Sequence, residues 1–93
     1  MWSAILIWRI DLTETTRKQL AKMGNAEAKR ITTFLRQRLA MLDDPRSTGK
    51  ALTGPLGGLW RYRVGDCRVI CDIQDGAVRI LVVRIGNRRE VYR

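Results

Sequence analysis

The chain has 93 residues, with 18 basic and 9 acidic side chains that give a formal net charge of +9 and a pI near 10.8. This length allows one domain, spanning residues 1–93, with a single modest core. No apolar run approaches the roughly 20 residues of a membrane-spanning helix, and no signal-peptide pattern is present. The sequence therefore predicts a cytoplasmic protein with no membrane partner, whose surface attracts polyanions such as RNA, DNA or an acidic protein.

The N-terminal quarter is predicted to form a strand followed by a surface helix. Residues 2–10 are almost continuously apolar, which favours a strand covered on both faces or paired in the middle of a sheet. Asp11 or Thr13 is expected to cap the helix, because Glu14 stands in the capping-box position after Asp11. The helix is expected to stop at Gly24, since glycine is common just beyond helix ends.

A longer second helix is predicted to follow, capped by Asn25 and ended by residues 43–45, where a proline follows two aspartates. Its apolar residues recur three and four positions apart and form one stripe, made by Ala28, Ile31, Phe34, Leu35, Leu39 and Leu42. The two helices would form a hairpin whose stripe needs an apolar surface. Residues 45–58 are rich in glycine and proline and predict a loop, in which Lys50 could contact either the core or a ligand.

Three strands are predicted in the second half of the chain, over residues 59–64, 67–73 and 78–85. Gly65-Asp66 and Asp75-Gly76 have the composition of the turns that join them. The last strand is apolar on both faces, which predicts a central position in the sheet. The order β-α-α-β-β-β predicts an α/β (α+β) fold, with a mainly antiparallel sheet packed against the N-terminal helical hairpin.

Arginines gather on one face of the predicted sheet. Strand alternation puts Arg61 and Arg63 on one face, while Trp60 and Tyr62 take the other and are expected to join the core. Arg68 follows the same alternation on the next strand. If the helices cover the apolar face, these three arginines cluster on the open face, which suits a phosphate chain.

The residue types present restrict the chemistry. The chain has no histidine, which excludes Ser-His-Asp and Cys-His catalysis and histidine-based metal sites. Cys67 and Cys71 would lie about 13 Å apart on one strand, too far to form a disulfide, and are predicted to be reduced core thiols. No metal or cofactor is therefore predicted. Guanidinium groups and the phenols of Tyr62 and Tyr92 remain.

RNA can be cut with these groups alone. Its own 2′-hydroxyl attacks the adjacent phosphate, so the protein has to align the hydroxyl and neutralise the phosphorane. Arginine suits the second task because its charge is permanent and its planar fork matches phosphate oxygens. The same residues would also suit passive RNA binding.

Three stretches carry a family resemblance: Gly-Leu-Trp-Arg-Tyr-Arg-Val-Gly-Asp at 58–66, Arg-Val-Ile at 68–70, and Gly-Asn-Arg-Arg-Glu-Val-Tyr-Arg at 86–93. Over nearly its whole length the chain resembles the RelE toxins of bacterial toxin–antitoxin systems. The resemblance implies the toxin component of a type II system, a ribosome-dependent endoribonuclease (mRNA interferase). Such a toxin cuts mRNA in the ribosomal A site and so inhibits translation.

The resemblance also implies roles for individual residues. Arg61 and Arg63 would hold the RNA backbone, and Arg68 would stabilise the phosphorane. Arg88 would support the transition state or leaving group, and Tyr92 would stack on or orient the nucleotide. Further RNA contacts are expected from Lys50, Arg89 and Arg93. Many relatives have a histidine where this chain has Asn87, so catalysis would rest mainly on geometry and charge.

The implied partners are the ribosome with its 16S rRNA, mRNA, and a cognate acidic antitoxin, RelB-like or of another type. Operator DNA would be bound only through the toxin–antitoxin complex. Two alternatives remain open. A ParE-like inhibitor of DNA gyrase would share the scaffold and tolerate loss of Arg68 and Arg88. A non-catalytic RNA-binding module would bind RNA with strong salt dependence and never cut it.

Overall fold

The computed structural model describes residues 7–87 of the chain; residues 1–6 and 88–93 lie outside the described part. Its sheet has five strands in the order β1-β5-β4-β3-β2, and only the β1–β5 pair is parallel. This confirms the predicted mixed fold and adds the short strand β2. In chain order the main elements are β1 (Arg9–Leu12), α1 (Glu14–Lys22), α2 (Asn25–Gln37), β2 (Lys50–Ala51), β3 (Trp60–Val64), β4 (Cys67–Gln74) and β5 (Arg79–Asn87).

Strand β1 lies at the edge of the sheet, so the prediction of a central first strand was wrong. The strand covers only Arg9–Leu12, and most of the stretch predicted for it lies outside the described residues. Ile10 and Leu12 pack against the core, as does the buried Trp8 just before the strand. The apolar residues here fill one side of an edge strand, and they do not reflect burial on both faces.

The two helices are joined by a very short connection, which explains one wrong prediction about their caps. Thr13 caps α1, as one alternative proposed, and its hydroxyl accepts a hydrogen bond from the Thr16 amide at 3.2 Å. Helix α1 ends at Lys22 with Met23 as its C-cap, which confirms the predicted stop at Gly24, and Gly24 is at the same time the N-cap of α2 with φ −62°. Asn25 is consequently the first residue of α2 instead of its cap. With so few linking residues, extended backbone at Met23 and Gly24 ends one helix and starts the next.

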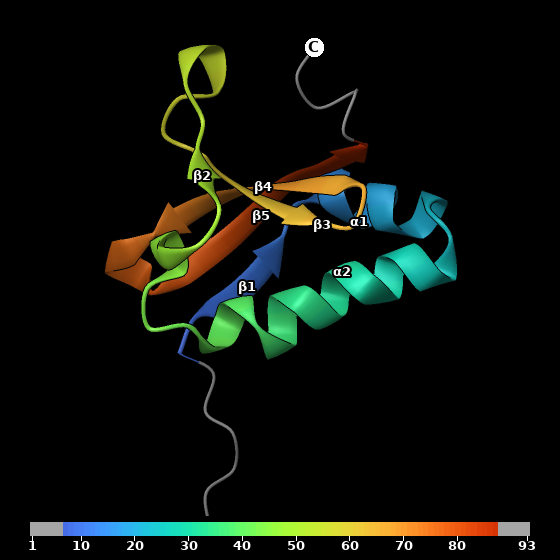
Figure 1. Cartoon of the computed structure of the whole chain (residues 1–93), viewed down its shortest axis with the longest axis horizontal. Coiled ribbons are helices and arrows are strands. Elements are labelled where there is room, and N and C mark those ends of the chain that lie inside the picture. The colour runs from blue at the N-terminus through green and yellow to red at the C-terminus, as the bar shows by residue number, and fades with distance from the viewer. Residues whose placement is uncertain (1–6, 88–93) are drawn as a thin grey trace, which may run out of the picture.

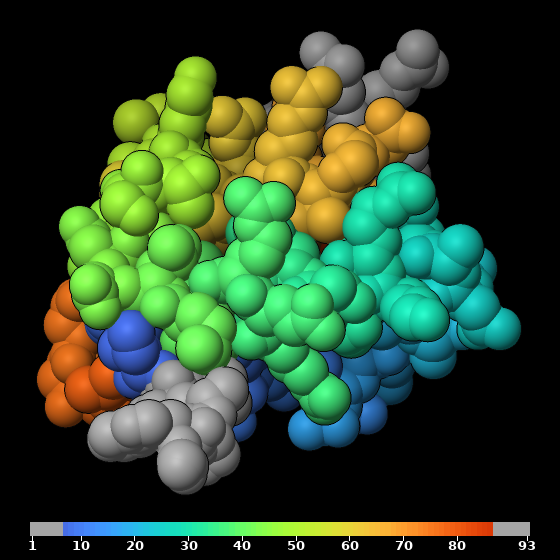
Figure 2. Space-filling view, turned by 60° about the horizontal axis from the view of Figure 1, so that its bottom comes forward, coloured from blue at the N-terminus to red at the C-terminus, as the bar shows by residue number. Residues whose placement is uncertain are grey.

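Helix α2 covers the sheet with the predicted apolar stripe. Ile31, Leu35 and Leu39 are buried, although the α-helix ends at Gln37 and Leu39 lies in a following 3₁₀ turn. The helix is therefore shorter than its sequence pattern indicated. In Figure 2 it crosses the face turned toward the viewer, in teal to green, with the segment that follows it at the upper left.

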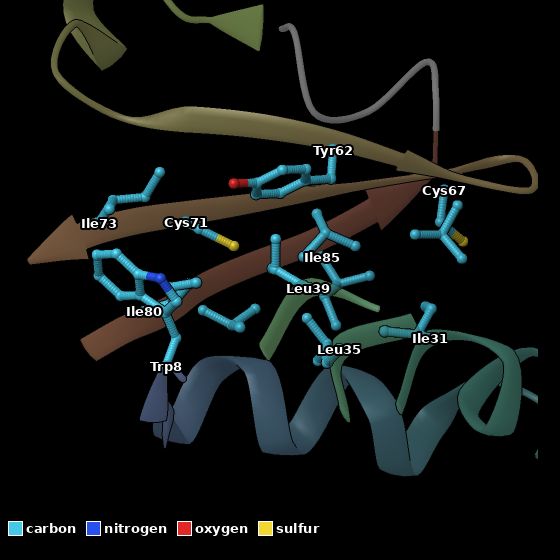
Figure 3. Packing of buried hydrophobic residues seen from close by; sticks show 13 residues of the cluster. Trp8, Ile31, Leu35, Leu39, Tyr62, Cys67, Cys71, Ile73, Ile80 and Ile85 are labelled. Carbon is cyan, nitrogen blue, oxygen red and sulfur yellow. The ribbon is translucent and has the colours of Figure 1, made fainter. Parts of the chain in front are cut away.

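The core lies between the sheet and the helices, as Figure 3 shows with strands above and helices below. From β3 and β4 it takes the side chains that the alternation assigned to the inner face, including Tyr62 and Val69. Cys67 and Cys71 are buried free thiols, as predicted. Burial raises the pKa of both thiols.

Strand β5 contains a β-bulge. Ile70 pairs with Arg84 and Cys71 with Val82, which leaves Val83 without a partner on β4. Val82 faces the core before the bulge and Ile85 faces it afterwards. The extra residue therefore reverses the alternation that the sequence alone would assign to the end of β5.

On the side away from β4, the backbone of β5 is hydrogen-bonded first to β1 and then to residues of α1 and its cap. Beyond the last β1 pair, the hydroxyls of Thr16 and Thr13 donate to the carbonyls of Val82 and Val83. The Gln19 side-chain oxygen accepts from the Ile85 amide at 2.7 Å. Strand β5 is thus interior, as its apolar faces predicted. No helix among the described residues is long and apolar enough to cross a membrane.

Val78, just before β5, has a left-handed backbone with φ 49° and ψ 49°, which is unfavourable for a β-branched side chain. Because it is 45% exposed, little packing is lost on truncation. We expect Val78→Gly to raise the free energy of unfolding by about 1 kcal/mol. Urea denaturation measures this, with Ala77→Gly as the control. That neighbour lies outside the left-handed region, so its substitution should be destabilising. Equal effects of the two changes would contradict the assignment of strain to Val78.

Candidate nucleic-acid interface

The register of the β3–β4 hairpin brings three arginines to one face of the sheet. Arg63 lies directly opposite Arg68, and Arg61 lies opposite Ile70. Directly paired residues of antiparallel strands point to the same side. That side is the one turned away from the core, because Tyr62 and Val69 take the inner side of the same two strands.

The three arginines differ in their exposure to solvent. Arg68 is only 7% exposed, Arg61 is half-buried, and Arg63 is exposed. The most buried guanidinium is also the one on the inner strand of the pair. A cation held in this way interacts with an anion more strongly than one fully surrounded by water.

A groove of about 280 Å³ runs beside these arginines. Strand β2 forms part of its wall, since Lys50 pairs with Arg61. Lys50 is exposed and does not join the core, which was one of the two environments that its sequence left open. None of the described residues that line the groove is a carboxylate; they are Phe34, Thr48, Gly49, Lys50, Arg61, Tyr62, Arg63 and Arg68.

The loop that carries Lys50 is held by two aromatic residues of β3. The Tyr62 hydroxyl donates to the Pro45 carbonyl at 2.5 Å, and the Trp60 indole nitrogen donates to the Thr48 carbonyl at 2.7 Å. The Tyr62 ring packs at the same time against Phe34 of α2, with 5.8 Å between ring centroids. The predicted core location of Tyr62 is confirmed, and Trp60 packs against the core while remaining partly exposed.

Gly49 allows the loop to approach β3. It has φ +78°, and a Cβ at this position would lie 2.4 Å from the Arg61 carbonyl oxygen. No side chain fits there without movement of the backbone. The glycine thus sets how closely Lys50 can approach the arginines.

An ion pair ties the same loop to the turn between β4 and β5. Both terminal nitrogens of Arg46 donate to the Asp75 carboxylate, at 2.9 and 3.0 Å. The hydrogen bond lowers the pKa of Asp75 and raises that of Arg46. The Arg46 guanidinium also lies 6.0 Å from the centroid of the Trp60 ring. Sequence reasoning missed this contact, because the partners are 29 positions apart and each looks like ordinary surface.

Tyr62 is unsuited to proton transfer, although its phenol was one of two candidates. Burial raises its pKa well above the usual value, and its proton is directed at the Pro45 carbonyl. Among the described residues no three Cys, Asp or Glu side chains converge as metal ligands.

Four predicted site residues, Arg88, Arg89, Tyr92 and Arg93, lie outside the described residues. The described chain ends beside the arginine cluster, because Gly86 pairs with Arg68.

Arg84 is a basic residue of this face that sequence reasoning left out. It is exposed and lies opposite Ile70. Strict alternation along β5 would have put it on the core side with Ile80 and Val82. The signal that could have found it is the charge itself, because an unpaired arginine is rarely placed in a core.

Comparisons with known proteins agree with this architecture. A family model described as the ParE toxin of a type II toxin–antitoxin system, parDE, matches residues 10–92. Toxin RelE of Mycobacterium tuberculosis is 31% identical over 86 residues, which cover 92% of this chain and 87% of that protein. The match supports the resemblance carried by the three sequence stretches.

Solved structures share the fold at lower identity. The toxin–antitoxin complex RelBE2 from Mycobacterium tuberculosis contains a chain that superposes with a TM-score of 0.81 at 23% identity, covering 94% of this chain and 98% of that one. The isolated Escherichia coli RelE toxin gives a TM-score of 0.67 at 20% identity, covering 91% and 90%. With the family match and the curated relative, these findings show that the chain belongs to the RelE/ParE family of toxins from type II toxin–antitoxin systems.

Proposed function

We propose that this toxin is a ribosome-dependent mRNA endonuclease that cleaves in the ribosomal A site and thereby inhibits translation. The observation that carries the proposal is the convergence of Arg61, Arg63 and Arg68 on one groove, whose wall within residues 7–87 contains no carboxylate. Such a groove attracts phosphates and offers no acidic ligands for a catalytic metal. It suits a reaction in which the RNA supplies its own nucleophile.

In this reaction the 2′-hydroxyl oxygen attacks the adjacent phosphorus while the bond to the 5′-oxygen breaks. The hydroxyl proton leaves and the 5′-oxygen gains a proton, so the products are a cyclic phosphate and a 5′-hydroxyl. Negative charge grows on the phosphorane oxygens between these events. Arg68 is the residue best suited to stabilise it, because its largely buried guanidinium is already desolvated.

Arg61, Arg63 and Lys50 are more exposed and serve to bind the flanking backbone. Arg63 stands directly opposite Arg68, so the two side chains lie on the same face and could approach one phosphate. Bidentate contacts from arginine would fix the orientation of that phosphate as well as its charge. Arg88 and Tyr92 keep their sequence-based roles at the leaving group and nucleotide, with Arg89 and Arg93 as further contacts.

Dependence on the ribosome fits the composition of the groove. Among the described residues that line it, none is a carboxylate, a histidine or a thiol, and Tyr62 is engaged by Pro45. The described residues of the groove therefore supply positive charge and hold the RNA in position, and they supply little to the proton transfers. Ribosomal RNA would hold the mRNA in line and assist the proton steps.

The toxin is expected to act in the cytoplasm with a cognate antitoxin. Relatives of this fold occur in complexes named for RelB together with RelE, from Pyrococcus horikoshii and Escherichia coli. A net charge of +9 favours an acidic antitoxin that covers the arginines. Binding to operator DNA would then depend on the complex.

Inhibition of DNA gyrase is the second candidate, favoured by the match to a ParE family model. That activity would need no phosphorane stabilisation, so the arginine pair would be dispensable. The two candidates therefore differ in their dependence on Arg68.

Replacing Arg68 with alanine should reduce mRNA cleavage about 100-fold or more, because a main stabiliser of the phosphorane is lost. Primer extension on a defined mRNA in a purified translation system measures the cuts, with and without ribosomes. Arg36→Ala is the matched control, since Arg36 is exposed on the helical side of the molecule. Intact mRNA with the wild-type toxin, together with gyrase-dependent DNA breaks, would support the ParE-like activity instead.

Gly49→Ala should lower the free energy of unfolding by about 3 kcal/mol, because a left-handed backbone and a backbone clash combine. Gly54→Ala provides the control: Gly54 has φ +68°, but a Cβ there meets nothing within 4 Å, so its loss should be about 1 kcal/mol. Urea denaturation compares the two variants. In the cleavage assay, below the unfolding midpoint, Gly49→Ala should also be the less active one. Equal costs would show that the approach of the loop to β3 is not tight.

A further inference from the structure

The arginine cluster continues across the sheet to β5. Pairing places Arg84 beside Ile70, Ile70 beside Arg61, and Arg61 beside Lys50. These four residues form one row over β5, β4, β3 and β2, perpendicular to the strands. Figure 1 shows the strands of this row side by side, with α2 on the other side of the sheet.

We propose that Arg84 binds a backbone phosphate of the RNA, so that the RNA crosses the sheet along this row from Lys50 to Arg84. The proposal rests on the proposed function, since it assigns a further contact and a direction to the same substrate. Neighbouring strands lie about 4.8 Å apart, so Lys50 and Arg84 are separated by about 14 Å at the backbone. That distance is too wide for one phosphate, and the row would bind at least two.

Burial places Arg84 on the correct face. Ile70 is only 1% exposed, yet it does not belong to the core cluster between the sheet and the helices. It therefore lies on the opposite side, where the stems of Arg61 and Arg84 are placed to cover it. Arg84 itself is exposed, and the next residue, Ile85, is buried in the core.

The charge of Arg84 is not compensated within residues 7–87, where it makes no ion pair. The other basic residues near this edge are paired. Arg9 and Arg79 both contact the same carboxylate oxygen of Asp11, at 3.0 and 3.1 Å. Of the two arginines on β5, Arg84 is therefore the one available to an external anion.

Two carboxylates lie beside the row, displaced along the strands. Asp72 pairs with Leu81, and Asp11 pairs with the same residue from the other side. Both acids lie on the arginine face, next to the row. The Gln74 side chain donates to Asp72 at 3.0 Å and fixes the position of its carboxylate. Asp72 repels a polyanion that extends along the strands. The basic residues of the row attract a polyanion that crosses the strands.

The test uses a short single-stranded RNA with 2′-O-methyl groups, which the toxin cannot cut, and fluorescence anisotropy over a range of salt. Arg84→Ala should weaken binding about fivefold and reduce the slope of log K against log salt by about 0.7. Arg36→Ala removes the same charge from the helical side and should change affinity less than twofold. Asp72→Asn should bind about twofold more tightly, because it removes a repelling charge and keeps the contact with Gln74.

Equal affinity of Arg84→Ala and Arg36→Ala would overturn the proposal, as would an unchanged salt slope. So would a variant that binds RNA normally but loses affinity for an acidic antitoxin, which would assign Arg84 to the protein interface. Urea midpoints equal to wild type exclude unfolding as the cause of weak binding. If wild-type toxin fails to cut mRNA on ribosomes while Arg84→Ala still weakens RNA binding, the nuclease assignment fails and the role of Arg84 stands.

Discussion

The pairing register of β3 with β4 is the constraint on which the rest of the structure depends. A shift of β3 by one residue would turn Arg61 and Arg63 toward the helices, away from Arg68 on β4, and would expose Tyr62. The register is held by the two-residue turn, where Gly65 adopts φ +60°, and by the burial of Tyr62 and Val69 against the helices. Core packing and the position of the arginines are thus two results of the same alignment.

Much of the fold and part of the site could be predicted from the sequence, because both follow from local alternation. The strands β3 and β4 alternate strictly, so their inner and outer faces are readable from residue types alone. The stripe on α2 has helical spacing and likewise identified Ile31 and Leu35 as core. The family resemblance added roles for the arginines, which physical reasoning could describe only as suited to phosphate.

The remaining features depend on contacts between distant parts of the chain. Strand β2 has two residues and exists because Lys50 pairs with Arg61 and because Trp60 and Tyr62 hold the loop before it. The bulge at Val83 cannot be recognised from the sequence, because Val82 and Val83 are equally suited to a regular strand. The bulge nevertheless determines the face of the sheet on which Arg84 lies. Strand β1 is at the edge because it pairs with β5 alone, about 70 positions later in the chain, and no local pattern indicates that pairing.

The order of strands in the sheet has a consequence for how this toxin is made. Strand β5 comes last among the described elements, yet it lies between β1, which comes first, and β4. A hairpin of β3 and β4 alone would be marginal in water. While its C-terminal segment is still inside the exit tunnel, a nascent chain lacks the strand that completes the sheet under the arginines. A finished groove therefore forms only after β5 has left the tunnel and paired with β4.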